Sequence, residues 1–200
     1  MSAGKGITRR GAIGGALAGA AFLGSPAIGA AAGQSDPRAL NYRGVIDRGT
    51  PAFRGIRYAR AQRFDKPIRE PLPDSETPAT QFGPLCPQRN PMTPEMSEDC
   101  LFLNIWSADP RPDVRRPVMV YFHGGAYNWG SVTDPITQGP HLAAEGDVVV
   151  VSVNHRINLF GYGWLSPFGE RFIHSGNAGQ LDLICALEWI RDHIGAFGGD

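Results

Sequence analysis

Apolar residues gather in three short runs in the second half of the chain, and each run predicts a β-strand. Val118–Phe122 is introduced by Pro117 and stopped by two glycines, which is the pattern of a buried strand with a tight exit loop. Val148–Val153 is an almost continuous run of valine, so it predicts an interior strand of a sheet covered on both faces. Leu101–Trp106 predicts a further strand ahead of both.

Between and after these runs the apolar spacing becomes helical. His141–Glu145 predicts a short helix ended by Gly146, and strand, helix and strand in succession predict a parallel pair with a right-handed crossover. A longer helix is predicted from Asn177, where Gln180 three residues later resembles a capping box, to an end at Gly195. Its apolar positions recur at helical spacing: Leu183, Ala186, Leu187, Ile190 and Ile194.

The first half of the chain has a weaker pattern. Val45–Ile56 predicts short strands that form a hairpin around the turn at residues 47–50. The stretch from Tyr58 to Pro94 is rich in proline and has no sustained period. We interpret it as ordered irregular chain, because Phe64, Leu72 and other apolar side chains are available for packing; the alternative is a disordered linker.

Composition narrows the function only slightly. Of 200 residues, 42% are hydrophobic and 19% are charged, as in ordinary soluble globular proteins. The formal net charge of zero gives no electrostatic argument for a nucleic-acid partner. The five histidines lack the spacing of a zinc site and no glycine-rich phosphate loop is present, so we expect neither a metal nor a cofactor.

The N-terminus has the pattern of a targeting peptide. Lys5, Arg9 and Arg10 make it positive, and the Ala/Gly-rich stretch that follows has no charge up to residue 33. The twin arginine resembles the bacterial twin-arginine export signal, and Ala32 ends a small-residue cleavage site. We therefore expect a leader at residues 1–32, a domain at residues 33–200, and a periplasmic or secreted protein. The alternative is an uncleaved membrane anchor.

Export would permit a disulfide. Cys86 and Cys100 are separated by 13 residues in the proline-rich stretch, and a bond between them would close a loop there. Such a bond would contribute up to about 3 kcal/mol to stability on the chain-entropy estimate. Cys185 lies among apolar residues of the predicted long helix, so we interpret it as a small buried apolar residue and not as a nucleophile.

The most informative chemistry follows the strand at Val118–Phe122. His123–Ala126 offers consecutive peptide N–H groups with almost no side-chain cover, so that a substrate oxygen could approach the main chain closely. This is the design of an oxyanion hole, in which each donor contributes roughly 3–4 kcal/mol to acyl transfer. The alternative is a glycine-rich turn without a ligand.

Six stretches in the same order make the sequence resemble the type-B carboxylesterase and cholinesterase-like family, from about Arg43 to Asp200. The resemblance implies the α/β-hydrolase fold, an α/β class in which this chain forms the N-terminal part of a mostly parallel sheet with covering helices, truncated before the nucleophile elbow. The matching stretches are Phe53–Ala59, Ser97–Trp106, His123–Ala126, Val151–Arg156, Asn177–Asp182 with Ala186–Trp189, and Phe197–Asp200.

The resemblance also implies roles for individual residues. The backbone N–H groups of Gly125 and Ala126 would be oxyanion donors, joined by an N–H just after the nucleophile. Ala126 stands where some members have a third glycine, and we expect this change to be tolerated because the N–H acts and the side chain does not. The family also has two structural pairs of arginine and acid, and removing one partner of a buried pair would cost about 3–5 kcal/mol. In this sequence the pairs are Arg156 with Asp182 and Arg63 with Glu98.

Two positions depart from the family pattern: Leu183 replaces a usual glutamine, and His155 replaces a usual tyrosine. Neither touches the chemistry that the resemblance implies, and both leave substrate preference open. The family's general base lies far toward its C-terminus, so the resemblance assigns that role to neither His123 nor His155. We expect His123 to orient the glycine loop by hydrogen bonds and His155 to pack at a strand end.

The family's triad consists of a serine in a Gly-x-Ser-x-Gly elbow, an acid and a histidine. This sequence contains no such elbow, which the resemblance places shortly after Asp200. We therefore expect the chain to hold the oxyanion-hole half of an active site and to be inactive alone. We also expect Val148–Val153 to have an unpaired edge and an exposed apolar face.

The sequence thus favours a serine-dependent carboxylic ester hydrolase, of the carboxylesterase or lipase type, acting on small-molecule or lipid esters. Three alternatives stay open. The whole protein could be a non-catalytic, cholinesterase-like binding module, or the sequence could come from a decayed gene or be a short product with a binding role of its own. The residue at the nucleophile elbow would discriminate the hydrolase from the binding module, and cooperative unfolding of a soluble monomer would support the short product. Oligomeric state leaves no trace in the sequence.

Overall fold

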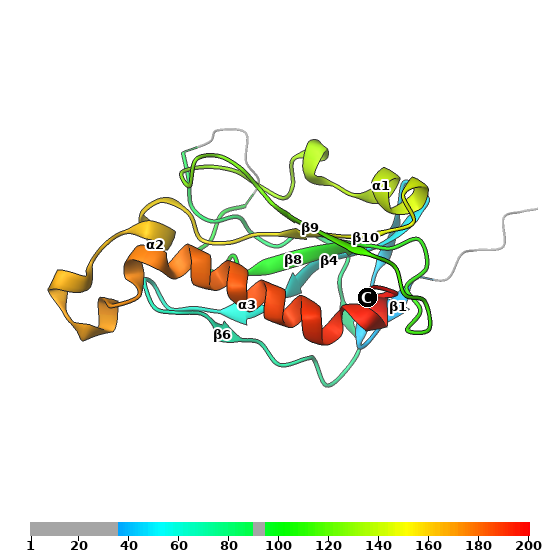
Figure 1. Cartoon of the computed structure of the whole chain (residues 1–200), viewed down its shortest axis with the longest axis horizontal. Helices are drawn as coiled ribbons and strands as arrows, with labels where there is room; N and C mark the ends of the chain where they lie inside the picture. Colours follow the sequence, from blue (N-terminus) through cyan, green and yellow to red (C-terminus); the bar gives the residue numbers. More distant parts are fainter. Residues whose placement is uncertain (1–35, 90–94) are drawn as a thin grey trace, which may run out of the picture. The chain divides into compact units, whose positions relative to one another are not determined.

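In a computed structural model, which describes residues 36–89 and 95–200, a five-stranded sheet forms the centre of the chain (Figure 1). The predicted leader at residues 1–32 lies outside the described residues. The strands stand in the order β3-β4-β8-β10-β9. Their bounds are Val45–Asp47 for β3, Thr50–Arg57 for β4, Phe102–Trp106 for β8, Val118–Phe122 for β9 and Val149–Val153 for β10.

The remaining elements are short, with one exception. The helices are α1 (Pro140–Glu145), α2 (Asn158–Tyr162) and the long α3 (Ala178–His193). Two-residue strands form two small sheets: β1 (Arg38–Ala39), β2 (Tyr42–Arg43) and β7 (Thr77–Pro78) form one, and β5 (Ala59–Arg60) and β6 (Ile68–Arg69) form the other. Single 3-10 turns lie at Pro135–Thr137, Ser166–Phe168, Glu170–Phe172, Ser175–Asn177 and Ile194–Phe197.

The predicted pairing is confirmed in part. Strands β9 and β10 pair in parallel and α1 lies between them in the sequence, as predicted. The other three pairings of this sheet are antiparallel, so the parallel majority is not present among the described strands. The predicted hairpin also forms, because Arg48 and Gly49 adopt the left-handed backbone conformation, with φ of 49° and 86°, that a tight two-residue turn requires.

Two predictions about strand position were wrong. Strand β10 has no free edge, because it pairs with β8 on one side and β9 on the other, and all five of its residues are buried. Strand β9 was expected to be buried and lies instead at the edge of the sheet. Its Met119 and Tyr121 side chains are 49% and 41% exposed, while the residues between them are half-buried.

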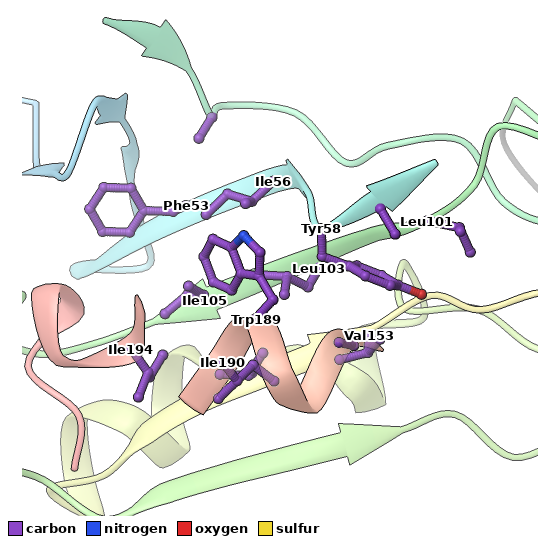
Figure 2. Packing of buried hydrophobic residues seen from close by; sticks show 14 of the residues in the cluster. Phe53, Ile56, Tyr58, Leu101, Leu103, Ile105, Val153, Trp189, Ile190 and Ile194 are labelled. Carbon is purple, nitrogen blue, oxygen red and sulfur yellow. The ribbon is translucent and has the colours of Figure 1, made fainter. Parts of the chain in front are cut away.

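Helix α3 covers one face of the sheet, where most of the core lies. Trp189 and Ile190 of α3 are buried against Phe53 of β4 and Ile105 of β8 (Figure 2). The alternate valines of β10, 149, 151 and 153, belong to the same cluster because side chains alternate between the faces of a strand. The continuous valine run is therefore explained by burial on both faces.

A smaller cluster lies on the opposite face. It joins Ala143 of α1 to Val150 of β10 and to Trp106 of β8. The indole N–H of Trp106 donates to an Asp47 carboxylate oxygen at 2.9 Å, which satisfies the buried polar atom of a fully buried side chain. Figure 1 shows α1 and α3 on opposite sides of the sheet.

The helix ends agree with the predictions except at the start of α3. Helix α1 ends with Gly146 as its C-cap, and α3 runs into a 3-10 turn that begins at Ile194. The predicted capping box is absent, since the Asn177 side chain makes no capping hydrogen bond. Asn177 ends a 3-10 turn that leads directly into α3, so the backbone enters the helix without the usual side-chain cap.

The predicted Cys86–Cys100 disulfide is not formed in this structure. All three cysteines lie in the described part of the chain, and all three are buried free thiols. The Cys86 and Cys100 thiols interact with each other, and this interaction lowers the pKa of Cys86. Backbone hydrogen bonds hold the loop closed instead: the Leu85 N–H donates to the Glu95 carbonyl, and the Ser97 N–H donates to the Leu85 carbonyl. Burial raises the pKa of Cys185 to about 11, as expected for an inert buried thiol.

Over residues 36–89 and 95–200, no helix combines the length and the apolar character needed to cross a bilayer.

Candidate functional site

The glycine loop leaves the carboxyl end of β9 in an unusual backbone conformation. Three consecutive residues have positive φ: Gly125 at 122°, Ala126 at 52° and Tyr127 at 62°. For residues with a Cβ this left-handed conformation costs roughly 1–2 kcal/mol each. Ala126 therefore occupies a position where glycine would be unstrained. Strain of this kind gathers at functional sites, where surrounding contacts hold it in place.

Within the loop, the backbone carbonyl of Gly125 accepts two hydrogen bonds, and two backbone N–H groups have no acceptor among the described residues. The Gly125 carbonyl accepts hydrogen bonds from the N–H groups of Asn128 and Trp129, at 3.0 and 3.2 Å. Within the described residues, the N–H groups of Gly125 and Ala126 donate to no acceptor. Two adjacent free donors in a fixed turn are what an anionic oxygen needs for binding.

A cavity of about 280 Å³ adjoins this loop. Loop residues His123, Gly124 and Ala126 line one part of it, and the side chains of Ile157 and Leu183 line another. Tyr127 and Tyr162 also line it, with their rings packed edge to face at 4.8 Å between centroids. The cavity is thus mainly apolar, with polar backbone at one side.

The two residues Tyr127 and Trp129 are not core residues. Their side chains are 62% and 57% exposed. Trp129 lines a second, more open cavity of about 600 Å³ together with Gln88 and Phe160. Both therefore border open space beside the loop.

The ring of His123, the first residue of the loop, stacks on the ring of His155. The rings of His123 and His155 lie 4.6 Å apart between centroids and are inclined by 25°. His123 Nδ1 lies 3.0 Å from the Gly124 carbonyl oxygen. Burial, with the nearby His123 as a second cause, lowers the pKa of His155 to about 3. Burial also lowers the pKa of His123. Both rings are therefore neutral at pH 7.

We expect His155 to make stability depend on pH. Its folded pKa of about 3 lies below the ordinary value of 6.5, so the unfolded chain takes up a proton first as the pH falls. The free energy of unfolding should then fall by about 1.4 kcal/mol per pH unit below pH 6.5 through this residue. The difference in stability between wild type and His155→Phe, measured by urea unfolding from pH 7.5 to 5, should shrink at this slope. The exposed His141→Phe serves as control, and parallel curves for wild type and His155→Phe would refute the expectation.

Arg156 and Asp182 form a buried ion pair. The Nε and Nη2 atoms of Arg156 donate to the two carboxylate oxygens at 2.9 and 2.7 Å, and its backbone N–H donates to the same carboxylate at 3.1 Å. Their side chains are 3% and 0% exposed. The remaining guanidinium nitrogen donates to the carbonyls of Asp65 and Gln62, at 2.8 and 3.3 Å. The pair thus joins α3, the end of β10 and the irregular segment after β5.

The pair of Arg63 and Glu98 also forms, but it is not buried. Arg63 Nε donates to a Glu98 oxygen at 2.7 Å, and a second bond joins Nη2 to the other oxygen. The side chains are 59% and 36% exposed. The large cost expected for breaking a buried pair therefore does not apply to it.

For Arg63→Ala we expect a small loss of stability, far below that of a substitution in the Arg156–Asp182 pair. Water solvates the Glu98 carboxylate once its partner is gone, and the exposed pair is screened by salt. Thermal unfolding at low and high salt checks this. A large drop in midpoint at both salt concentrations would contradict it.

Sequence reasoning missed two residues that hold the loop. The Gln88 side chain bonds to both backbone groups of Gly130 at the loop's exit. Asn158, at the start of α2, donates its backbone N–H to the Tyr127 carbonyl at 2.5 Å. Asn158 has a φ of 50°, a conformation that asparagine tolerates. The sequence does not reveal φ, so nothing in it marked this residue in advance. Gln88 left no signal, because a single polar residue in an irregular segment has no pattern.

Comparison with known proteins identifies the family. The model of the Carboxylesterase family matches residues 40–200. This chain belongs to that family. Its fold is the N-terminal part of the α/β-hydrolase fold, since the solved structures it resembles are carboxylesterases of that fold.

Individual relatives agree with the family assignment. The para-nitrobenzyl esterase of Bacillus subtilis (strain 168) is 38% identical over 169 residues, which are 79% of this chain and 34% of the relative. The acetylcholinesterase of Gallus gallus is 38% identical over 181 residues, 90% of this chain and 21% of the relative. The structure of a carboxylesterase from Geobacillus stearothermophilus has a TM-score of 0.73 and 42% identity, and the match covers 80% of this chain and 34% of that one.

An esterase from Clostridium hathewayi, described as hydrolysing aliphatic aromatic polyesters, has a TM-score of 0.75 and 44% identity. The match covers 80% of this carboxylesterase-family chain and 34% of that protein. The chain therefore spans about a third of the length of these bacterial relatives.

Proposed function

We propose that this chain carries the oxyanion donors of a serine-dependent carboxylic ester hydrolase. The observation that supports this most directly is the pair of free N–H groups at Gly125 and Ala126 beside a cavity. In acyl transfer, negative charge develops on the carbonyl oxygen of the tetrahedral intermediate, and each fixed donor there lowers the barrier by roughly 3–4 kcal/mol. Family membership supports an ester as the acyl donor.

The histidines beside the loop take supporting roles in this proposal. A general base works best with a pKa near the operating pH, and His155 with a pKa of about 3 is too weak a base at pH 7. His123 lies against the Gly124 carbonyl and helps to fix the loop. The base of the reaction is therefore neither of the two.

The nucleophile is also assigned elsewhere. The 200 residues contain no Gly-x-Ser-x-Gly elbow. An acyl-enzyme cannot form without a nucleophile, so we propose that these residues alone do not hydrolyse esters and that a serine outside them completes the site.

The substrates are proposed to be small-molecule or lipid esters. The apolar lining of the 280 Å³ cavity, including Ile157 and Leu183, suits an apolar acyl or alcohol group beside the polar loop. Export to the periplasm or medium through the twin-arginine-like leader, residues 1–32, is part of the same proposal. N-terminal sequencing of the protein recovered from the host would test the leader, with a start near residue 33 as the expected result.

The function is tested with the protein as its gene encodes it and with residues 33–200 alone. The gene product should hydrolyse p-nitrophenyl acetate and butyrate and should react with a fluorophosphonate probe at a single serine. Residues 33–200 should do neither. A folded gene product that neither turns over the esters nor takes up the probe would refute the hydrolase and favour a binding module.

A further inference from the structure

The side-chain amide of Gln88 forms two hydrogen bonds with the backbone of Gly130, at the exit of the glycine loop. Its Nε2 donates to the Gly130 carbonyl, and its Oε1 accepts from the Gly130 N–H, each at 2.8 Å. The same Nε2 lies 3.2 Å from the carbonyl oxygen of Cys86, which aligns the amide with its own segment. Gln88 thus replaces the backbone partner that Gly130 would have in a β-ladder.

Gly130 in turn touches the start of the loop. With φ of 136°, it lies so close to the His123 ring and the Gly124 carbonyl that an added Cβ would collide with both. Gly125 lies equally close to the Trp129 carbonyl. The exit of the loop is therefore packed against the peptide groups that precede the two donors. A shift of Gly130 toward the start of the loop would therefore displace Gly124 and Gly125, because these groups are already closely packed.

A second set of hydrogen bonds, made by Asn158, also joins the loop to residues 86–88. Asn158 donates its backbone N–H to the Tyr127 carbonyl, at 2.5 Å, and its side-chain Nδ2 to the Pro87 carbonyl, at 2.7 Å. The next residue toward the N-terminus, Ile157, donates its N–H to the Cys86 sulfur at 3.4 Å. The loop is thus tied to residues 86–88 at two points, and one of these ties runs through Gln88 alone.

We propose that Gln88 is a positioning residue for the oxyanion donors at Gly125 and Ala126. This inference rests on the proposed hydrolase function for its catalytic consequence. The planar amide of Gln88 supplies a donor and an acceptor side by side at neutral pH, which the two groups of Gly130 require. Gln88 touches no reacting atom and acts through Gly130. Because the loop holds Ala126 and Tyr127 in a strained conformation, loss of this tie lets it relax away from the geometry that stabilises the transition state.

The kinetic test compares Gln88→Ala with wild type in the protein as its gene encodes it. We expect kcat for p-nitrophenyl esters to fall by about 10- to 100-fold with KM within about threefold, because donors displaced by a fraction of an ångström stabilise the transition state less. Gln138→Ala is the matched control, since that amide also donates one bond, to the Thr133 carbonyl, and accepts one, from Arg48, at a different loop. A changed KM with unchanged kcat, or an equal loss in both variants, would overturn the inference.

Gln88→Glu separates positioning from general folding. A carboxylate still accepts from the Gly130 N–H but opposes the carbonyls of Gly130 and Cys86, while its protonated form regains a donor. The ratio of kcat for Gln88→Glu to kcat for wild type should therefore rise as the pH falls from 8 to 5. A ratio independent of pH would count against the inference.

Amide hydrogen exchange tests the inference without catalysis. In Gln88→Ala the N–H groups of Asn128 and Trp129, which donate to the Gly125 carbonyl, should exchange at least about tenfold faster than in wild type, because a loosened loop opens locally more often. In Gln138→Ala they should not change. Faster exchange at Gly130 alone would overturn the inference. If the wild-type protein hydrolyses no ester, the proposed function fails, and this measurement still decides whether Gln88 holds the loop.

Discussion

Asp182→Asn should lower the free energy of unfolding by about 3–5 kcal/mol. The substitution keeps the size of the side chain but removes the charge that faces Arg156, whose side chain is only 3% exposed. Three hydrogen bonds end on the Asp182 carboxylate, and an amide can accept at only one of its two positions. The guanidinium is then left buried without a counter-charge. Urea unfolding of the protein as its gene encodes it, followed by tryptophan fluorescence, measures the loss.

The double variant Arg156→Met with Asp182→Leu keeps this expectation testable if Asp182→Asn does not fold. Replacing both partners removes the uncompensated charge, so the double variant should be more stable than the single one. Glu98→Gln, in the exposed pair with Arg63, is the matched control and should change stability little. Equal losses for Asp182→Asn and Glu98→Gln would mean that burial does not set the cost of breaking the pair.

Gly125→Ala should abolish most of the esterase activity that we propose for the protein as its gene encodes it. At Gly125, φ is 122°, and an added Cβ would collide with the Trp129 carbonyl oxygen. Either the loop or the Trp129 peptide must then move, and the two donors move with it. Loss of one oxyanion donor lowers kcat by about 10²- to 10³-fold, and we expect a loss of that size. Steady-state kinetics with p-nitrophenyl butyrate would measure it.

Gly169→Ala separates the collision from backbone strain. Gly169 has a similar φ of 136°, but an added Cβ there would meet no atom within 4 Å. The two variants therefore share the strain of a left-handed backbone, and only Gly125→Ala adds the steric conflict. We expect Gly169→Ala to lose stability and to keep kcat. Similar kcat values for the two variants would show that the loop conformation does not control the reaction.

The sequence predicted the strands well because the buried strands consist mostly of apolar residues. The valine run of β10 reflects burial on both faces of the strand, and the apolar spacing of α3 reflects burial of one face of the helix. The order of strands across the sheet is different, because it depends on which edges remain free after pairing. Strand β9 was expected to be buried, because its apolar side chains do not reveal that it lies at the edge of the sheet formed by the described strands.

The candidate site was predictable to the same degree. The loop and the Arg156–Asp182 pair were located from motifs shared with the family, in which the residue type itself indicates the interaction. Exposure of the Arg63–Glu98 pair could not be predicted, because ion pairs on the surface and in the core have the same sequence letters. Gln88 and Asn158 escaped notice since their role is to bond backbone groups distant in sequence, which no local pattern records.

The order of the described strands also determines when they can pair during synthesis. Strands β3 and β4 form a local hairpin as soon as both have left the ribosome, but β10 is made after β9 and inserts between β8 and β9. Both of the pairings that β10 makes therefore wait for its arrival. Until Val149–Val153 is made, the edges of β8 and β9 that β10 occupies stay unpaired, and unpaired strand edges favour aggregation.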